Sequence, residues 1–182
     1  MRSRTKVLDA TLTLITRDGF DAVSIAGVAK ASGVSRQTVY SIFGSREDLV
    51  SQAVASAALA ELDDILTRLN GTESPCEYVV ELLVAGRAAV RGNPVLSALH
   101  RSGREHPFFD TGMVSRAEPV VRQLLEPMSE KYPETVPEID DITDVTLFLG
   151  LSVVLFDDPE MHSDDELRQF LTRWLGPAMP KP

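Results

Sequence analysis

The sequence has little of what secreted and membrane proteins need. Its 182 residues contain one cysteine, Cys76, so an internal disulfide framework is excluded and a reducing compartment is indicated. The longest uncharged apolar run, Val145 to Phe156, has 12 residues, and a helix that crosses a bilayer needs ~20. Asp9 interrupts the first apolar segment, which does not resemble a secretion signal. We therefore expect a cytoplasmic protein.

Motifs for catalysis, cofactors and metals are also scarce. The three histidines have no spacing typical of metal ligands, and glycine-rich phosphate-binding patterns are absent. Cys76 has no nearby base that could activate it as a nucleophile. Near a helix N-terminus its pKa could be lowered, as in a redox sensor, although a small buried apolar residue is the simpler interpretation. We expect no enzyme, no catalytic residue, no cofactor and no metal.

Helical periodicity runs through the whole chain, and neither a strand pattern nor an internal repeat is present. Ser45, Ser74 and Ser163 are each followed three residues later by an acidic residue, a pattern typical of helix starts. Expected helices include 5–17, 45–69, 74–91, 138–156 and 163–175. We expect residues 2–6 to form a basic arm, 106–112 a loop, Ser115 to begin the next helix, and 128–138 to form an exposed linker. The predicted fold class is all-α, with about nine helices.

One stretch, residues 24–43, indicates two short helices joined by a tight turn. Ile25, Val28 and Ala29 have the spacing of one apolar helix face. Gly33 can adopt the positive φ that a sharp turn requires, and Ser35 is a suitable N-cap for the second helix. This is the organisation of a helix-turn-helix, whose second helix can enter a major groove.

The charge of the chain is divided unevenly. The net charge is -9, yet residues 1–50 hold 7 Lys/Arg and 5 Asp/Glu, for a local charge of +2. The remaining residues carry -11. Such an asymmetry is expected when one end docks on DNA, although plain surface variation also produces it.

The outward face of the second short helix favours DNA over a protein partner. Arg36, Gln37, Thr38, Tyr40 and Ser41 supply hydrogen-bond donors and one cation, with no acid. The alternative is an adaptor whose helix-turn-helix binds protein, but the face lacks an exposed apolar anchor.

Two C-terminal segments, 138–156 and 163–175, offer more apolar surface than a body of this size can cover. Two such helices from each of two subunits would form a four-helix bundle. The alternative is that both pack into the core of one subunit. The expected dimer-interface residues are Phe148, Leu151, Leu155, Phe170 and Trp174.

Residues 25–49 resemble the TetR family of bacterial regulators. The resemblance rests on Ala31-Ser32-Gly33-Val34-Ser35, on Thr38 to Phe43 with its tyrosine and phenylalanine, and on Ser45 to Leu49. The resemblance extends over about the first 50 residues of the chain. The sequence departs from the family pattern at Ile42, often histidine, at Gln37, commonly glycine, and at Arg46, usually lysine.

The resemblance implies a DNA-binding domain, 1–46, and a helical effector-binding and dimerisation domain, 47–182. It also implies a homodimeric transcriptional regulator of the repressor type, which binds a palindromic DNA operator and is released by a small-molecule effector. Arg36, Gln37 and Thr38 would read bases. Phosphate contacts would come from Ser24, Ser35, Tyr40, Ser41 and Arg46.

Two residues of the body are candidates for effector binding. Arg87 lies on an apolar face of its helix and could meet an anionic ligand, or it could pair with an internal acid or reach the surface. His100, four residues after Leu96, is the second candidate. His106 and His162 are expected in loops.

Overall fold

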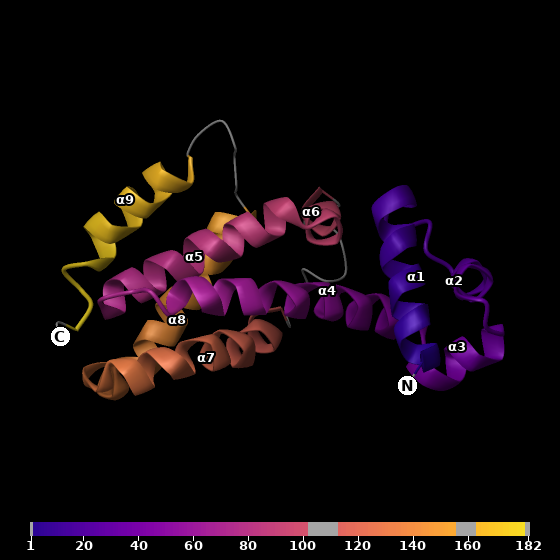
Figure 1. The fold of residues 1–182 in the computed structure, drawn as a ribbon, viewed down its shortest axis with the longest axis horizontal. Coiled ribbons are helices and arrows are strands. Elements are labelled where there is room, and N and C mark those ends of the chain that lie inside the picture. Colours follow the sequence, from indigo (N-terminus) through magenta and orange to yellow (C-terminus); the bar gives the residue numbers. More distant parts are fainter. Residues whose placement is uncertain (1, 102–112, 156–162, 181–182) are drawn as a thin grey trace. The chain divides into compact units, whose positions relative to one another are not determined.

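The computed structural model describes residues 2–101, 113–155 and 163–180. Within these ranges the chain is helical and contains no strand, which confirms the predicted fold class. The elements, shown in Figure 1, are α1 (Arg2–Asp18), α2 (Ile25–Ser32), α3 (Arg36–Phe43), α4 (Arg46–Leu69), α5 (Pro75–Gly92), α6 (Pro94–Arg101), α7 (Met113–Lys131), the 3-10 helix η2 (Pro133–Glu138), α8 (Ile139–Leu155) and α9 (Asp164–Leu175).

The described residues divide into two compact units. The first holds the chain up to Leu62 together with the segment from Arg91 to the end of α6, and the second holds residues 63–90 and the chain from Met113 onward. The first unit thus contains the expected 1–46 domain, the first part of α4 and α6, which contacts α1.

In the first unit, α1, α2 and α3 surround a small apolar core. Val7 and Ile15 of α1, Val28 of α2 and Val39 of α3 are all fully buried. The basic segment at the N-terminus was expected as an arm but is the first turn of α1, which begins at Arg2. Lysine and arginine are good helix formers, so nothing stops the helix there.

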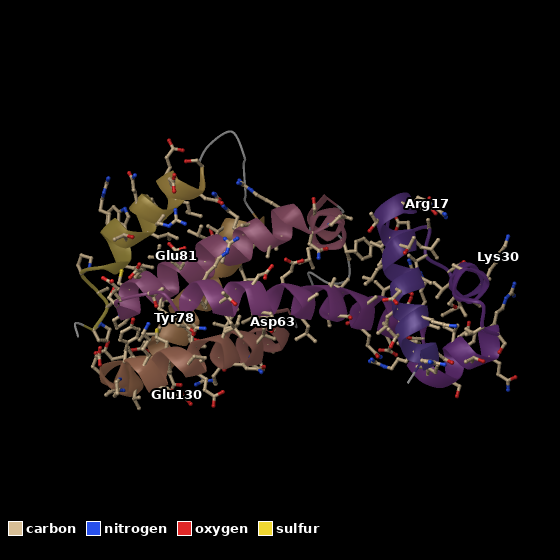
Figure 2. All side chains as sticks on the ribbon, viewed as in Figure 1. Arg17, Lys30, Asp63, Tyr78, Glu81 and Glu130 are labelled. Carbon is tan, nitrogen blue, oxygen red and sulfur yellow. The ribbon has the colours of Figure 1, made fainter. Side chains whose placement is uncertain are left out.

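The core of the second unit is built mainly from α5, α7 and α9. Leu83, Leu125 and Leu171 belong to one buried cluster. Two ion pairs join α9 to α5: Arg87 with Asp164, and Arg168 with Glu81, which is labelled in Figure 2. Among the described residues, no helix is long and apolar enough to cross a membrane.

The predicted linker over residues 128–138 is wrong. α7 continues to Lys131, and η2 follows directly. Met128 and Thr135 are fully buried, and the hydroxyl of buried Tyr132 donates to the Thr72 carbonyl at 2.7 Å. The prolines of this segment lie in the short 3-10 helix, and Thr135 between them is buried.

The predicted serine caps are confirmed at three helix starts. The Oγ atoms of Ser45, Ser74 and Ser163 each accept a hydrogen bond from a backbone N–H three residues on. Ser115 is different, because α7 already includes Met113, so this serine lies within the helix. The expected loop over 106–112 lies outside the described residues.

Candidate nucleic-acid interface

The geometry of α2 and α3 is set by two serine caps and one glycine. Ser24 Oγ accepts from the N–H of Gly27 at 3.1 Å, and Ser35 Oγ accepts from the N–H of Thr38 at 3.0 Å. Between the helices, Gly33 has φ +70, and its N–H donates to the Ala29 carbonyl. A positive φ favours glycine, so the turn predicted from the sequence is the turn observed.

The two faces of α3 divide as the sequence predicted. Val39 and Phe43 are buried, and Ile42 is half-buried. The opposite face exposes Arg36, Gln37, Tyr40 and Ser41, all reachable by a partner outside the unit. Thr38 is half-buried, and its hydroxyl lies 2.8 Å from Ser35 Oγ.

The exposed surface near α3 carries positive charge. Lys30 in the last turn of α2 is exposed, and Figure 2 shows it extending from that helix. α3 itself contributes Arg36 and no acidic residue. By contrast, the exposed Arg17 is bound to the neighbouring Asp18 carboxylate, which raises its pKa. Lys30 and Arg36 therefore place two exposed cations on the helix-turn-helix.

Arg46 is placed differently from the other predicted DNA-contacting residues. Its Nε donates to the Val23 carbonyl and one of its terminal nitrogens donates to the Phe20 carbonyl, both at 2.6 Å. The other terminal nitrogen lies 3.7 Å from Glu47 Oε1. No sequence pattern indicates this arrangement, because the acceptors are backbone atoms more than twenty residues away.

The two predicted effector residues have different outcomes. Arg87 is 3% exposed and donates to Asp164 Oδ1 at 2.6 Å, so it pairs with an internal acid. This was one of the alternatives that the sequence left open. The side chain of His100 lies outside the described residues, as do His106 and His162.

One buried polar group of the second unit was missed by sequence reasoning. Thr146 of α8 is 3% exposed, and its hydroxyl has no hydrogen-bond partner among the described residues. Thr143, one turn earlier on the same helix, donates to the Ile139 carbonyl at 2.7 Å. Both residues look alike in the sequence, so no pattern could have distinguished them.

Large apolar side chains are exposed on α8 and α9. Phe148, Phe170 and Trp174 are exposed to 60%, 49% and 68%, and Val145, which the sequence analysis did not single out, is exposed as well. The rings of Phe170 and Trp174 lie 6.4 Å apart. Leu151 is half-buried, and the side chain of Leu155 lies outside the described residues.

Cys76 does not have the environment of a redox sensor. Burial, and then the neighbouring Glu77 carboxylate, raises the pKa of its thiol. A raised pKa leaves less thiolate at neutral pH, so the thiol is less reactive than a free one. The half-buried side chain packs against the core of the second unit. Among the described residues, no group of acids, histidines and cysteine could hold a metal.

Comparison with known proteins supports a regulatory role for the first unit. Residues 7–53 match the profile of the bacterial regulatory proteins of the tetR family. The HTH-type transcriptional regulator AlkX of Mycobacterium tuberculosis is 36% identical over 67 residues, 37% of this chain and 32% of that protein. The matched segments span between 32% and 46% of the length of the curated relatives.

The fold of this chain is similar to that of solved structures over almost its whole length. The TetR family repressor AlkX from a Dietzia strain, described as implicated in the biodegradation of n-alkanes, has a TM-score of 0.66 at 24% identity. The similarity covers 96% of this chain and 94% of that one. RolR, whose structure was determined without ligand, has a TM-score of 0.66 at 16% identity. The similarity covers 93% of this chain and 89% of RolR. At these identities the likeness establishes the fold.

The profile match, the relatives and the fold together indicate which family the helix-turn-helix resembles. The helix-turn-helix region, residues 7–53, is of the tetR family type, and the solved structures show the same fold over almost the whole chain. The curated relatives that it matches are named as HTH-type transcriptional regulators.

Proposed function

We propose that the protein is a homodimeric repressor that binds a palindromic DNA operator and is released by a small-molecule effector. The observation that carries the proposal is the exposed face of α3, where Arg36, Gln37, Tyr40 and Ser41 stand free beside a buried apolar stripe. A face with many donors and no acid suits an anionic partner rich in hydrogen-bond acceptors. A repressor that binds DNA also works in the cytoplasm, the expected location.

We assign the recognition of the DNA base sequence to the first turn of α3. An arginine pairs well with guanine and a glutamine with adenine, each good bidentate contact being worth ~1–3 kcal/mol of discrimination. We assign base contacts to Arg36, Gln37 and Thr38. Phosphate contacts are assigned to Ser24, Ser35, Tyr40 and Ser41, which would fix the register of the helix but carry no sequence preference.

A homodimer follows from the apolar surface that α8 and α9 leave uncovered. Phe148, Phe170 and Trp174 are large side chains whose exposure is costly in water. Pairing each helix with its copy across a twofold axis would bury them, and Leu151 and Leu155 belong to the same proposed interface. The twofold axis predicts operator half-sites ~34–36 Å apart, or somewhat more.

The proposed effector-binding and dimerisation domain is residues 47–182, which include the whole second unit. Release of the operator needs coupling of only ~1–3 kcal/mol between the effector site and the DNA-binding site. The buried Thr146 hydroxyl is a group that a ligand could satisfy, and Arg87 and His100 remain the candidates from the sequence. The relative from Dietzia makes n-alkanes and other alkyl compounds the first class to screen.

Selection of bound duplexes from a random DNA pool tests the proposal. The purified protein is expected to recover an approximate palindrome. The Gln37→Ala variant should recover the same palindrome with relaxed preference at one position in each half-site, whereas Ser41→Ala should weaken binding to all sequences alike. If a folded, dimeric wild-type protein recovers no preferred sequence, the operator-binding proposal fails and the protein-binding adaptor becomes the better interpretation.

A further inference from the structure

Arg46 joins the two ends of the helix-turn-helix. It is the first residue of α4 and follows the end of α3 by three positions. Its two acceptors, the carbonyls of Phe20 and Val23, lie in the segment that connects α1 to α2. Val23 immediately precedes Ser24, the N-cap of α2. The guanidinium therefore connects the entrance of the α2–α3 pair to its exit.

The acceptor segment is itself well ordered by packing. The side chains of Phe20 and Val23 are 3% and 2% exposed. The N–H of Val23 also donates to the Phe20 carbonyl at 3.2 Å, which closes a turn. Arg46 thus attaches α4 to a fixed point of the core and not to a loose loop.

The chemistry of this contact requires arginine. A guanidinium presents its N–H donors in a rigid plane, so Nε and a terminal nitrogen can serve two carbonyls at once. A lysine has one nitrogen on a flexible stem and could reach one carbonyl at a time. Hydrogen bonds from a charged donor are also stronger than neutral ones.

The same contacts argue against a phosphate-binding role. Two of the three nitrogens of Arg46 are committed within the unit, and the third lies near the Glu47 carboxylate. The guanidinium edge formed by Nε and one terminal nitrogen is occupied by these carbonyls, so only the opposite edge, next to Glu47, is left for a phosphate. We infer that Arg46 is a positioning residue that fixes the α2–α3 pair against the start of α4. This inference rests on the proposed DNA binding and replaces the phosphate contact expected for Arg46 from the sequence.

The Arg46→Lys variant separates the two roles, because it keeps the charge and removes the fork. The operator is the palindrome selected by the wild-type protein, and affinity is measured by fluorescence anisotropy over a range of salt concentrations. Arg17→Lys is the matched control, since Arg17 belongs to the same unit but is exposed and bound only to its neighbour Asp18. Thermal unfolding followed by circular dichroism checks that each variant is folded.

A positioning role predicts that Arg46→Lys loses operator affinity by about tenfold, the worth of one charge-assisted hydrogen bond. The slope of log affinity against log salt concentration, and the affinity for non-specific DNA, should match those of the wild type. Arg17→Lys should bind the operator as the wild type does. A phosphate contact predicts instead that Arg46→Lys binds like the wild type, while Arg46→Gln lowers the salt slope by ~0.9. That second pattern would overturn the inference.

A measurement on the wild-type protein covers the case in which the variant does not fold. The Nε–H resonance of Arg46 should be protected from exchange in the free protein and should stay in place when the operator is added. A large shift or a loss of protection on DNA binding contradicts the positioning role. If the wild-type protein selects no operator, the proposed function fails, whereas the Nε–H protection in free protein still reports on the contact itself.

Discussion

Arg87, buried on α5, donates to the carboxylate of Asp164 in the first turn of α9 across 2.6 Å. The arginine side chain is 3% exposed, whereas that of the aspartate is 44% exposed. A cation taken out of water needs a charged or hydrogen-bonding partner, because desolvation disfavours its charged form. The pair therefore fixes α9 at the point where the described chain resumes.

Asp164→Asn should lower the free energy of unfolding by about 1–2 kcal/mol, because the buried Arg87 cation loses its carboxylate. Urea unfolding at pH 7 measures the change. Asp165→Asn is the matched control: its carboxylate pairs with the more exposed Arg168 and is 86% exposed, so a change below about 0.5 kcal/mol is expected. Both aspartates lie in the first turn of α9, so the loss of their interaction with the helix dipole is shared. Equal effects of the two variants would contradict the special role of the buried pair.

Tyr78 gives the protein a specific sensitivity to high pH. It is buried on α5, is labelled in Figure 2, and donates from its hydroxyl to the Leu124 carbonyl at 2.8 Å. Burial raises the pKa of this phenol to about 12, from 10.0 for an unperturbed one. The folded state then holds the proton more tightly than the unfolded state. The contribution of Tyr78 to the free energy of unfolding is therefore constant below pH 10 and declines as the pH rises towards 12.

The Tyr78→Phe variant isolates this contribution. At pH 8 it should be less stable than the wild type by about 1 kcal/mol, the worth of one lost hydrogen bond. At pH 11 the wild type should have lost about 1.4 kcal/mol relative to the variant, one pKa unit of linkage, so the difference should close or reverse. Urea unfolding at both pH values provides the test. A difference that does not change with pH would mean that Tyr78 titrates normally.

Thr146 carries a buried hydroxyl that finds no hydrogen-bond partner in the part of the chain that the structure describes. Replacement by the isosteric valine removes a buried polar group that costs about 1–3 kcal/mol, so Thr146→Val should be more stable than the wild type. Thr143→Val is the control, because that hydroxyl donates to the Ile139 carbonyl and its loss should be neutral or mildly destabilising. Chemical denaturation of the two variants decides, and a destabilised Thr146→Val would show that the hydroxyl is satisfied in solution.

The parts of the fold predicted correctly are those encoded by neighbouring residues. Ser24 and Ser35 cap helices through bonds to residues three positions on, and Gly33 marks the turn by its own φ. The capping box at Ser163 is equally local and was predicted to the residue. Such signals need no knowledge of the rest of the chain.

The errors arise where distant contacts decide the structure. Residues 128–138 have the prolines and acids of a linker, yet Tyr132 binds a carbonyl 60 positions away and is drawn into the core. The contacts of Arg46 could not be predicted from the sequence, because its acceptors are backbone carbonyls, which have no sequence signature. The sequence also does not decide among the possible roles of Arg87, because its partner Asp164 lies 77 positions further along the chain.

The exposed aromatic residues of α9 provide the remaining prediction, which concerns the proposed dimer. Trp174 is the most exposed large apolar side chain among the described residues, at 68%, and Phe170 stands beside it. Buried aromatic residues at the centre of an interface cost at least about 2 kcal/mol when removed, or roughly 30-fold in affinity. Trp174→Glu should therefore weaken dimerisation by at least about 30-fold, with helix content and thermal unfolding of the monomer unchanged.

Sedimentation velocity over a concentration series measures this dimerisation. Leu59→Glu is the matched control, because Leu59 is 63% exposed but lies on α4, outside the proposed interface. It should dimerise like the wild type. A dimer that survives Trp174→Glu and dissociates with Leu59→Glu would place the interface on another helix. In a twofold dimer each substitution occurs twice, so an interface through α9 cannot escape the effect of two buried glutamates.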